Sequence, residues 1–284
     1  MTPLANVLIP AWNEAAVIPG ILSRLAQASA QNRLRIIVIA NNCSDATSEV
    51  ARETDPNAVV LETPQGGKAN AMNLGYQAAL PGIPVVCVDA DLLVSEADII
   101  ALIAPLVDGS AEASCGQMVP DLSRSSLIVK SFYKAWSLNP YFSRGKFGGL
   151  FAVSAVGASR IFPLPPVTAD DEWVRRSFTA QETAFIPETR FVAKAPKDVF
   201  TLIRLRRRSL RGARAVREAV GQQATENSDS SMLKIAMRDP SLWVPMAIYI
   251  AIMLTVRVQL RFEPAKAKTN WERDNVNRTT GAHP

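Results

Sequence analysis

The first 120 residues alternate short apolar runs with longer amphipathic runs, and this alternation limits the fold more than any other feature of the sequence. Strands that alternate with helices at this spacing are typical of a mostly parallel sheet with helices on both faces. The sequence therefore predicts an α/β fold. Strands are predicted at residues 6–9, 34–40, 58–61, 85–88 and 113–119, and helices at 14–30, 45–53, 68–79, 95–107 and 125–138, the fourth of which opens with the capping box Ser95-Glu96-Ala97-Asp98.

The single histidine excludes several classes of enzyme. His283 lies next to the end of a polar tail, whereas Ser-His-Asp hydrolysis, Cys-His chemistry and His-ligated zinc all need an imidazole inside the fold. Acid–base chemistry is therefore expected from carboxylates, lysine, tyrosine or a metal-bound group. With 48% hydrophobic and 20% charged residues, the 284-residue chain is globular and long enough for one large α/β domain or two small ones.

The cysteines and the N-terminal residues predict a cytoplasmic protein. Cys43, Cys87 and Cys115 are odd in number, widely spread and without metal-ligand spacing, as expected of reduced thiols. The chain begins Met1-Thr2-Pro3 and enters a strand almost at once, without a basic region followed by a long apolar stretch, so no secretory signal is expected.

Two carboxylates follow the strand predicted at residues 85–88. Side chains two residues apart on an extended segment point the same way, so Asp89 and Asp91 are expected to face one cation together. Carboxylate oxygens suit a hard ion such as Mg²⁺ or Mn²⁺, and such an ion suits a diphosphate. The other interpretation is structural, because Asp also ends strands as a turn former or helix cap.

Polar clusters follow the other predicted strands as well, or open the helix after them. In open α/β sheets, ligands bind in the crevice beyond the carboxyl ends of the strands. Four clusters on one edge therefore predict a nucleotide site, although any one alone fits ordinary turn chemistry. The clusters are residues 10–14 (Pro-Ala-Trp-Asn-Glu), 41–45 (Asn-Asn-Cys-Ser-Asp), 66–73 (Gly-Gly-Lys-Ala-Asn-Ala-Met-Asn) and 89–91 (Asp-Ala-Asp).

Taken in this order, the motifs resemble those of the family 2 glycosyltransferases, which have the GT-A fold, over about residues 5–215. The resemblance implies that the loop containing Pro10, Ala11, Trp12 and Glu14 lies against the nucleotide base, with Trp12 near uracil. At the Asn41 position the family usually has an Asp that accepts a hydrogen bond from the base. An amide oxygen can also accept one from the uracil N3–H.

The resemblance also assigns roles around the diphosphate and the sugar. Lys68 corresponds to a basic residue near the diphosphate. Asp89 and Asp91 match the DxD motif, in which the second Asp binds the metal and the first contacts ribose or metal. Gly148 and Gly149 resemble the glycine turn beneath the donor sugar, where absent side chains let the backbone approach a ligand.

Residues 168–172, Thr-Ala-Asp-Asp-Glu, resemble the family motif whose Asp is the general base. In this register Asp170 is the base, with Asp171 as the alternative one residue away, and Ala169 stands where Glu is frequent. The structural interpretation is a cap for a helix at residues 172–178, and Asp170 is able to serve both purposes. The implied reaction is a single displacement with inversion at the anomeric carbon.

Seven arginines lie between residues 204 and 217. Such a run suits phosphate groups or anionic lipid, or is simply a solvated helix face; nucleic acid is disfavoured because no aromatic residues are interleaved. Processive synthases of the family have a Gln-x-x-Arg-Trp motif here, but this chain has Leu205 and Ser209 at the Gln and Trp positions. Transfer of a single sugar is therefore expected, with Arg206 and Arg208 clamping the diphosphate or a phosphate-bearing lipid acceptor.

The segment at residues 240–256 carries no charge. It is at the short limit for crossing a membrane, so a buried or oligomer-forming helix, a membrane-surface helix and a full span are all considered, in descending order. The predicted organisation is a glycosyltransferase domain at 1–225, with a nucleotide-binding half at 1–120 and an acceptor half at 121–225. A C-terminal extension at 226–284 follows, with an apolar helix at 240–257 and a polar tail.

The function predicted from the sequence is a metal-dependent, inverting transfer of a hexose from a UDP-sugar to an acceptor hydroxyl. The expected partners are a nucleotide-sugar donor, a saccharide or lipid-linked acceptor and a membrane surface, but no nucleic acid. Cell-envelope or exopolysaccharide assembly on the cytoplasmic face of the membrane is the expected setting. Two alternatives stay open: a non-catalytic sugar-nucleotide-binding scaffold at the membrane, and, disfavoured by the residues after the first strand, a nucleotidyltransferase.

Overall fold

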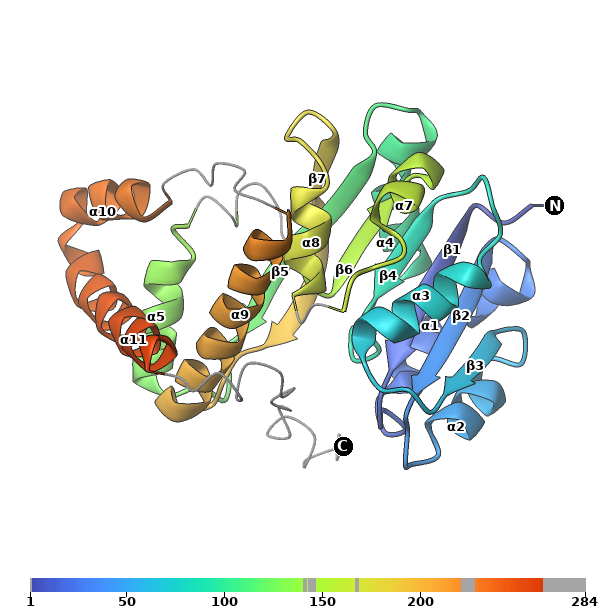
Figure 1. Ribbon diagram of the computed structural model, residues 1–284, viewed down its shortest axis with the longest axis horizontal. Helices are drawn as coiled ribbons and strands as arrows, with labels where there is room; N and C mark the ends of the chain where they lie inside the picture. The colour runs from blue at the N-terminus through green and yellow to red at the C-terminus, as the bar shows by residue number, and fades with distance from the viewer. Residues whose placement is uncertain (1, 140–141, 143–146, 167–168, 221–227, 263–284) are drawn as a thin grey trace. The chain divides into compact units, whose positions relative to one another are not determined.

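The computed structural model describes residues 2–139, 142, 147–166, 169–220 and 228–262 (Figure 1). The chain forms two compact units. The first unit comprises Met1–Met118 and Gly145–Val192, and the second comprises Val119–Arg144 and Ala193–Pro284. The predicted division at residue 225 stays a prediction, and the polar tail predicted after residue 262 lies outside the described residues.

The described strands of the chain form one seven-stranded sheet (Figure 1). Its first four strands in spatial order run parallel, and β6 pairs antiparallel with both of its neighbours. The prediction of an α/β fold with a mostly parallel sheet is therefore confirmed. The spatial order is β3 (Val59–Thr63), β2 (Leu34–Asn41), β1 (Ala5–Ala11), β4 (Val85–Val88), β6 (Leu150–Val153), β5 (Ala113–Asp121) and β7 (Thr183–Lys194).

Six helices among the described residues belong to the first unit. The predicted capping box is confirmed at the start of α4, where the Ser95 and Asp98 side chains each accept the other's backbone N–H. The helix predicted from residue 14 begins only at Ile18, because the N–H groups of Val17 and Ile18 both bond to the Glu14 carbonyl in a turn. The helices are α1 (Ile18–Ala30), α2 (Thr47–Thr54), α3 (Lys68–Gln77), α4 (Glu96–Val107), α7 (Ala155–Ile161) and α8 (Asp170–Arg176).

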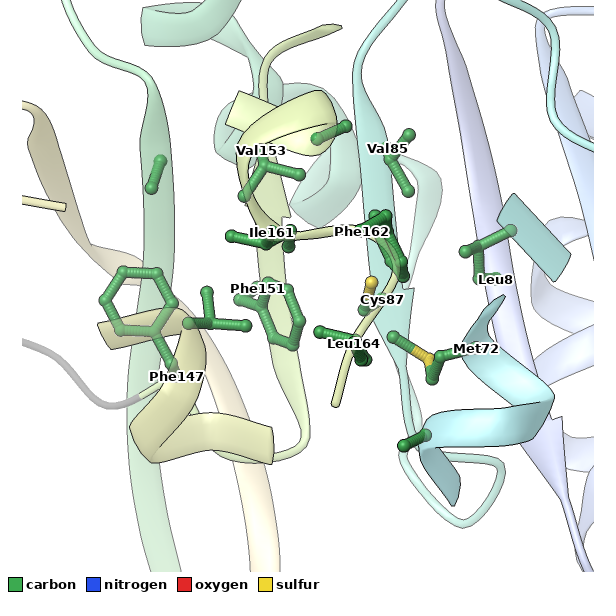
Figure 2. Close-up of a cluster of buried hydrophobic side chains, with 14 of the residues drawn as sticks. Leu8, Met72, Val85, Cys87, Phe147, Phe151, Val153, Ile161, Phe162 and Leu164 are labelled. Atoms are coloured by element: carbon green, nitrogen blue, oxygen red, sulfur yellow. The ribbon is translucent and has the colours of Figure 1, made fainter. Parts of the chain in front are cut away.

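One hydrophobic core joins the sheet of the first unit to helix α3 and to the chain around residue 162. Figure 2 shows Leu8 of β1, Met72 of α3 and Phe151 of β6 among its buried side chains. Gly75 allows close approach of α3 to the sheet, since a Cβ there would lie 2.7 Å from the Ile39 side chain. This packing fixes α3, whose first residue is Lys68.

Hydrogen bonds also tie α3 to a segment ninety-one residues later in the sequence. The Asn73 side chain accepts from the backbone N–H of Leu164 at 2.6 Å and donates to its carbonyl at 2.9 Å. The Tyr76 ring of the same helix stacks on the Phe162 ring, with centroids 4.3 Å apart. The chain that leads into α8 is therefore anchored to the helix that begins with Lys68.

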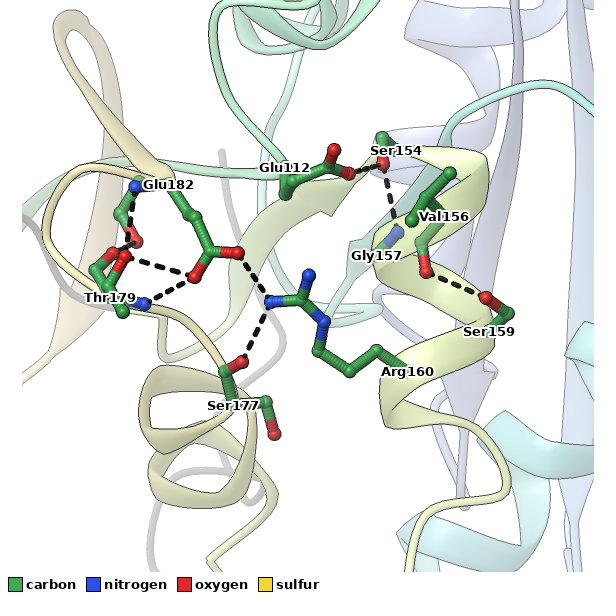
Figure 3. Close-up of polar contacts among 10 residues, drawn as sticks. Glu112, Ser154, Val156, Gly157, Ser159, Arg160, Ser177, Thr179 and Glu182 are labelled. Atoms are coloured by element: carbon green, nitrogen blue, oxygen red, sulfur yellow. Dashed lines mark hydrogen bonds and ion pairs between the residues drawn. The ribbon is translucent and has the colours of Figure 1, made fainter. Parts of the chain in front are cut away.

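A polar network joins α7 to the residues between α8 and β7 (Figure 3). Arg160 donates to the Glu182 carboxylate at 2.8 Å, and the backbone N–H of Thr179 donates to its other oxygen at 2.9 Å. These bonds lower the pKa of Glu182 from 4.5 to about 2. The backbone hydrogen bond from Thr179 has the largest effect, followed by the bond from Arg160.

Glu182→Gln should lower the melting temperature at pH 7 and have no effect below about pH 2. A carboxylate with a lowered pKa contributes stability above its unfolded pKa of 4.5 and loses that contribution as the pH falls through its folded value of about 2. Thermal unfolding of both proteins across this range measures the difference. Glu188→Gln, at an exposed position on β7, the strand that begins directly after Glu182, is the control. A gap between wild type and Glu182→Gln that is independent of pH would contradict this account.

The second unit is helical in its described part: α5 (Leu127–Trp136), α9 (Val199–Val220), α10 (Ser228–Arg238), the short 3₁₀ helix Pro240–Leu242 and α11 (Trp243–Arg261). Helix α11 packs against α5 and α9. One of its faces is buried, at Pro245, Met246, Tyr249, Ile252 and Val256. In the described chain, the segment Pro240–Arg261 is also the one helical stretch long and apolar enough to cross a membrane.

Candidate functional site

The loops after β1 and β2 are bonded to each other. Ser44 donates its backbone N–H to the Asn13 side-chain oxygen at 2.8 Å, and the Glu14 N–H donates to the Thr47 hydroxyl at 2.9 Å. The Trp12 indole N–H donates to the Asn42 carbonyl at 3.1 Å. Asn13 and Asn42 both have positive φ, near 53° and 51°, which Asn tolerates better than most residues. Trp12 and Glu14, with Pro10 and Ala11 before them, are thus held beside the Asn41 loop.

Asn41 is the last residue of β2 and is only 6% exposed. Its side-chain oxygen is buried and has no hydrogen-bond donor among the described residues. Buried polar atoms are nearly always paired, so an orphaned acceptor at a strand end calls for an explanation, such as a ligand.

Lys68 joins two carboxylates from distant parts of the chain. Its ammonium lies 2.8 Å from Asp89 Oδ1 and 2.9 Å from Asp170 Oδ2. Burial alone would lower the pKa of Lys68, but the charges of Asp170 and Asp89 raise it well above its usual value. The lysine is therefore a permanent cation at neutral pH, shared by two acidic groups.

The two aspartates after β4 are arranged differently from the prediction. The strand ends at Val88, and the Leu92 N–H bonds to the Asp89 carbonyl at 3.1 Å, so residues 89–92 form a turn. The expected extended segment is therefore wrong, and strand alternation does not set the directions of these side chains. Asp89 is half-buried beside Lys68, whereas Asp91 is exposed.

Gly149 lies directly against Asp89. Its carbonyl accepts the Asp89 N–H at 2.8 Å, and a Cβ on Gly149 would lie 3.3 Å from Asp89 Oδ2. Its φ of +85° is also one that residues with a side chain rarely adopt. Gly148, half-buried, precedes it in the same turn. Glycine at position 149 keeps the space beside the second carboxylate oxygen open.

Asp170 is the first residue of α8, and the Ala169 before it makes no side-chain cap. The helix predicted at 172–178 therefore begins two residues earlier, and the interpretation of Asp170 as its cap is wrong. The Asp170 side chain is only 12% exposed and binds Lys68 instead. The Asp171 carboxylate accepts the backbone N–H of Glu172 at 2.9 Å. Thr168 lies outside the described residues.

The predicted arginines belong to the second unit. Arg206 stacks over the Trp136 ring, with its guanidinium carbon 3.6 Å from the centroid, and also lies over the Phe132 and Tyr133 rings. Arg208, on the same helix, is half-buried. The aromatic stack of Arg206 was not foreseen, although the closely spaced aromatic residues at 132–136 were a visible signal.

Within the part of the chain that the structure describes, no three His, Cys, Asp or Glu side chains group as a preformed metal site. Two acidic residues, Asp89 and Asp170, instead contact Lys68. The family resemblance had assigned Lys68 only to the neighbourhood of the diphosphate. The buried Cys87 thiol also belongs to this neighbourhood. Burial raises its pKa well above its usual value, Lys68 lowers it and the two carboxylates raise it further.

The sequence of residues 6–160 matches the model of glycosyl transferase family 2. This match covers more than half of the chain, so the protein belongs to glycosyl transferase family 2. A comparison of the sequence with curated proteins found no match.

Solved structures show the same fold. A mannosyltransferase from Pyrobaculum calidifontis, in complex with GDP-Man and Mn²⁺, is 20% identical; the alignment covers 94% of this chain and 78% of that chain, with a TM-score of 0.60. Glucosyl-3-phosphoglycerate synthase from Mycobacterium tuberculosis, in complex with Mn²⁺, UDP-glucose and phosphoglyceric acid, is 16% identical, with 75% and 79% covered and a TM-score of 0.57. The prediction of a GT-A fold with a C-terminal helical extension is confirmed.

Lys68→Met should destabilise the protein by about 1–2 kcal/mol, because Asp89 and Asp170 would face each other without a shared cation. Adding Asp170→Asn to Lys68→Met should recover part of this loss, since only one charge then needs a partner. Denaturant unfolding of the two single variants and the double variant gives the coupling free energy. Additive effects would mean that the Lys68–Asp170 ion pair contributes nothing to stability.

Proposed function

We propose that this chain is an inverting hexosyltransferase that moves a sugar from a UDP-sugar to an acceptor hydroxyl. The observation that carries the proposal is the contact of Lys68 with both Asp89 and Asp170. The proposed base Asp170 and the strand-end carboxylate Asp89 therefore both contact Lys68, the cation proposed to face the diphosphate. Membership of glycosyl transferase family 2 supports the same reaction class.

The donor is proposed to bind beside the loops after β1 and β2. The orphaned, buried oxygen of Asn41 is suited to accept the uracil N3–H, and Trp12 offers a flat ring to the base. The similar solved structures include one described with GDP-Man and one with UDP-glucose, which supports a nucleotide sugar as the donor class.

The residues present fit a divalent cation, Mg²⁺ or Mn²⁺, that is completed by substrate. Such ions often use only one or two protein carboxylates, with the remaining ligands from phosphates and water. Asp91 is exposed, and the second oxygen of Asp89 faces the gap that Gly149 leaves open, so these two side chains would hold the ion. When bound, the ion would supply positive charge against the diphosphate. The Mn²⁺ in both similar structures supports this assignment.

Asp170 is proposed as the general base, which takes the proton from the acceptor hydroxyl as its oxygen attacks the anomeric carbon. Its carboxylate is mostly buried and already accepts from a cationic donor, the Lys68 ammonium. The C–O bond to the diphosphate breaks as the new bond forms on the opposite face, which inverts the configuration. The Lys68 ammonium is then positioned to neutralise the departing diphosphate, so its charge serves the base before reaction and the leaving group after it.

The acceptor is proposed to be a saccharide or lipid-linked hydroxyl in cell-envelope or exopolysaccharide assembly, at the cytoplasmic face of the membrane. The arginines of α9, Arg206 and Arg208 among them, suit a phosphate-bearing acceptor. One similar structure is described with phosphoglyceric acid, itself a phosphorylated acceptor class.

Asp170→Asn should lower sugar transfer by about 10²–10⁴-fold, because the amide cannot take a proton. UDP release from UDP-sugars in the presence of Mn²⁺ measures the rate. Asp171→Asn is the matched control, at the neighbouring carboxylate, and should retain most activity. Loss of activity in the control, with near-normal turnover in Asp170→Asn, would shift the base to Asp171.

Nucleotide sugars with Mn²⁺ should raise the melting temperature more than either alone, because a ligand that binds only the native state stabilises it. Asp91→Asn should lose the Mn²⁺-dependent part of this rise and keep the part due to nucleotide. Thermal shift assays over a set of UDP- and GDP-sugars measure both. An unchanged Mn²⁺ effect in Asp91→Asn would remove Asp91 from the metal site.

A further inference from the structure

Exposed apolar side chains gather where α5 and α9 begin. Leu127, in the first turn of α5, is 80% exposed, and Phe200, in the first turn of α9, is 83% exposed. The two helix starts are neighbours, because the Ser126 N–H donates to the Lys197 carbonyl at 2.8 Å. Large apolar side chains at two adjoining helix starts are therefore offered to solvent together.

Helix α11 runs back along α5 towards this place. Lys134, near the end of α5, contacts Ser241 just before α11, and the Phe132 ring lies 5.2 Å from the Tyr249 ring. The two helices are thus antiparallel, and the later turns of α11 lie on the side where α5 begins (Figure 1).

The face of α11 that points away from α5 and α9 is also apolar. The spacing of its exposed residues gives one stripe along the helix. Opposite this stripe lies the face that packs on α5 and α9. Helix α11 therefore has two apolar faces, of which only one is buried. The exposed large side chains are Trp243, Val244, Ile250, Leu254 and Val258, each at least 41% exposed.

Exposed basic residues follow these apolar residues at a spacing of three or four positions on the same helices. Lys130, Arg204, Arg257 and Arg261 are exposed on the same three helices. The carboxylate closest in sequence to Phe200, Asp198, is engaged by the Thr201 N–H at 2.8 Å. Over the whole second unit the sequence has twenty-one Lys and Arg against nine Asp and Glu, whereas the first unit has ten against seventeen.

We propose that the second unit docks on an anionic lipid bilayer, with the outer stripe of α11 and the first turns of α5 and α9 in the interfacial layer. Apolar side chains bordered by cations match an acidic membrane surface, where the apolar groups enter the headgroup boundary and the cations bind lipid phosphates. Crossing the bilayer is disfavoured, because α11 would have to leave its packing on α5 and α9. The proposal deepens the proposed function and rests on it only for the acceptor; docking itself needs no transfer.

Flotation of the full chain with vesicles tests the proposal. Binding is expected to vesicles of phosphatidylcholine with phosphatidylglycerol, to weaken with salt, and to fall at least about tenfold in Val244→Ser/Leu254→Ser/Val258→Ser and in Leu127→Ser/Phe200→Ser. These positions are exposed, so the variants should keep the wild-type melting temperature. The control Val107→Ser/Val156→Ser, at exposed apolar positions of the first unit, should bind like wild type.

Failure of the wild type to bind, or equal loss in the control, would overturn the proposal. Equal binding to pure phosphatidylcholine vesicles would overturn the anionic assignment. If the same variants instead abolish self-association of a protein that ignores vesicles, the partner is a second copy of the chain. UDP-sugar turnover in solution separates the two proposals, because vesicle binding without turnover refutes the transferase assignment alone, and turnover without binding refutes the docking alone.

Discussion

One cation organises the candidate site. Lys68 contacts Asp89 and Asp170, which are eighty-one residues apart in the sequence. Asp89 directly follows β4, and Asp170 is the first residue of α8. Two carboxylates that contact the same ammonium repel each other, and the positive charge that they share offsets that repulsion. The surrounding structure serves to place these groups: the core fixes α3, and the Asn73–Leu164 hydrogen bonds anchor the chain before α8.

Backbone geometry matters as much as charge. The turn at residues 89–92 gives Asp89 and Asp91 different exposures, and Gly149 bonds to the Asp89 N–H while leaving space at its second oxygen. A side chain at position 149 would fill that space. A site of this type is thus made by adjoining turns from two neighbouring strands, and neither turn alone would suffice.

Much of this was readable from the sequence, and the parts that were not have physical reasons. Strand–helix alternation predicted the parallel half of the sheet, because hydrophobic periodicity reports local burial. The Ser95 capping box was predicted correctly because its bonds join residues three apart. The turn after Val88 was missed because the pattern ends where the apolar run ends. The Lys68 ion pairs depend on packing between distant segments, and residue spacing carries no information about them.

The buried thiol of Cys87 has a consequence for chemical reactivity. Only the thiolate attacks electrophiles or is readily oxidised, and burial next to two carboxylates keeps this sulfur in its protonated form. Cys43, by contrast, is partly exposed in the loop after β2. Alkylating reagents and mild oxidants should therefore modify Cys43 in the loop after β2 while sparing Cys87, so that oxidative damage would reach that loop before it reached the charged centre at Lys68.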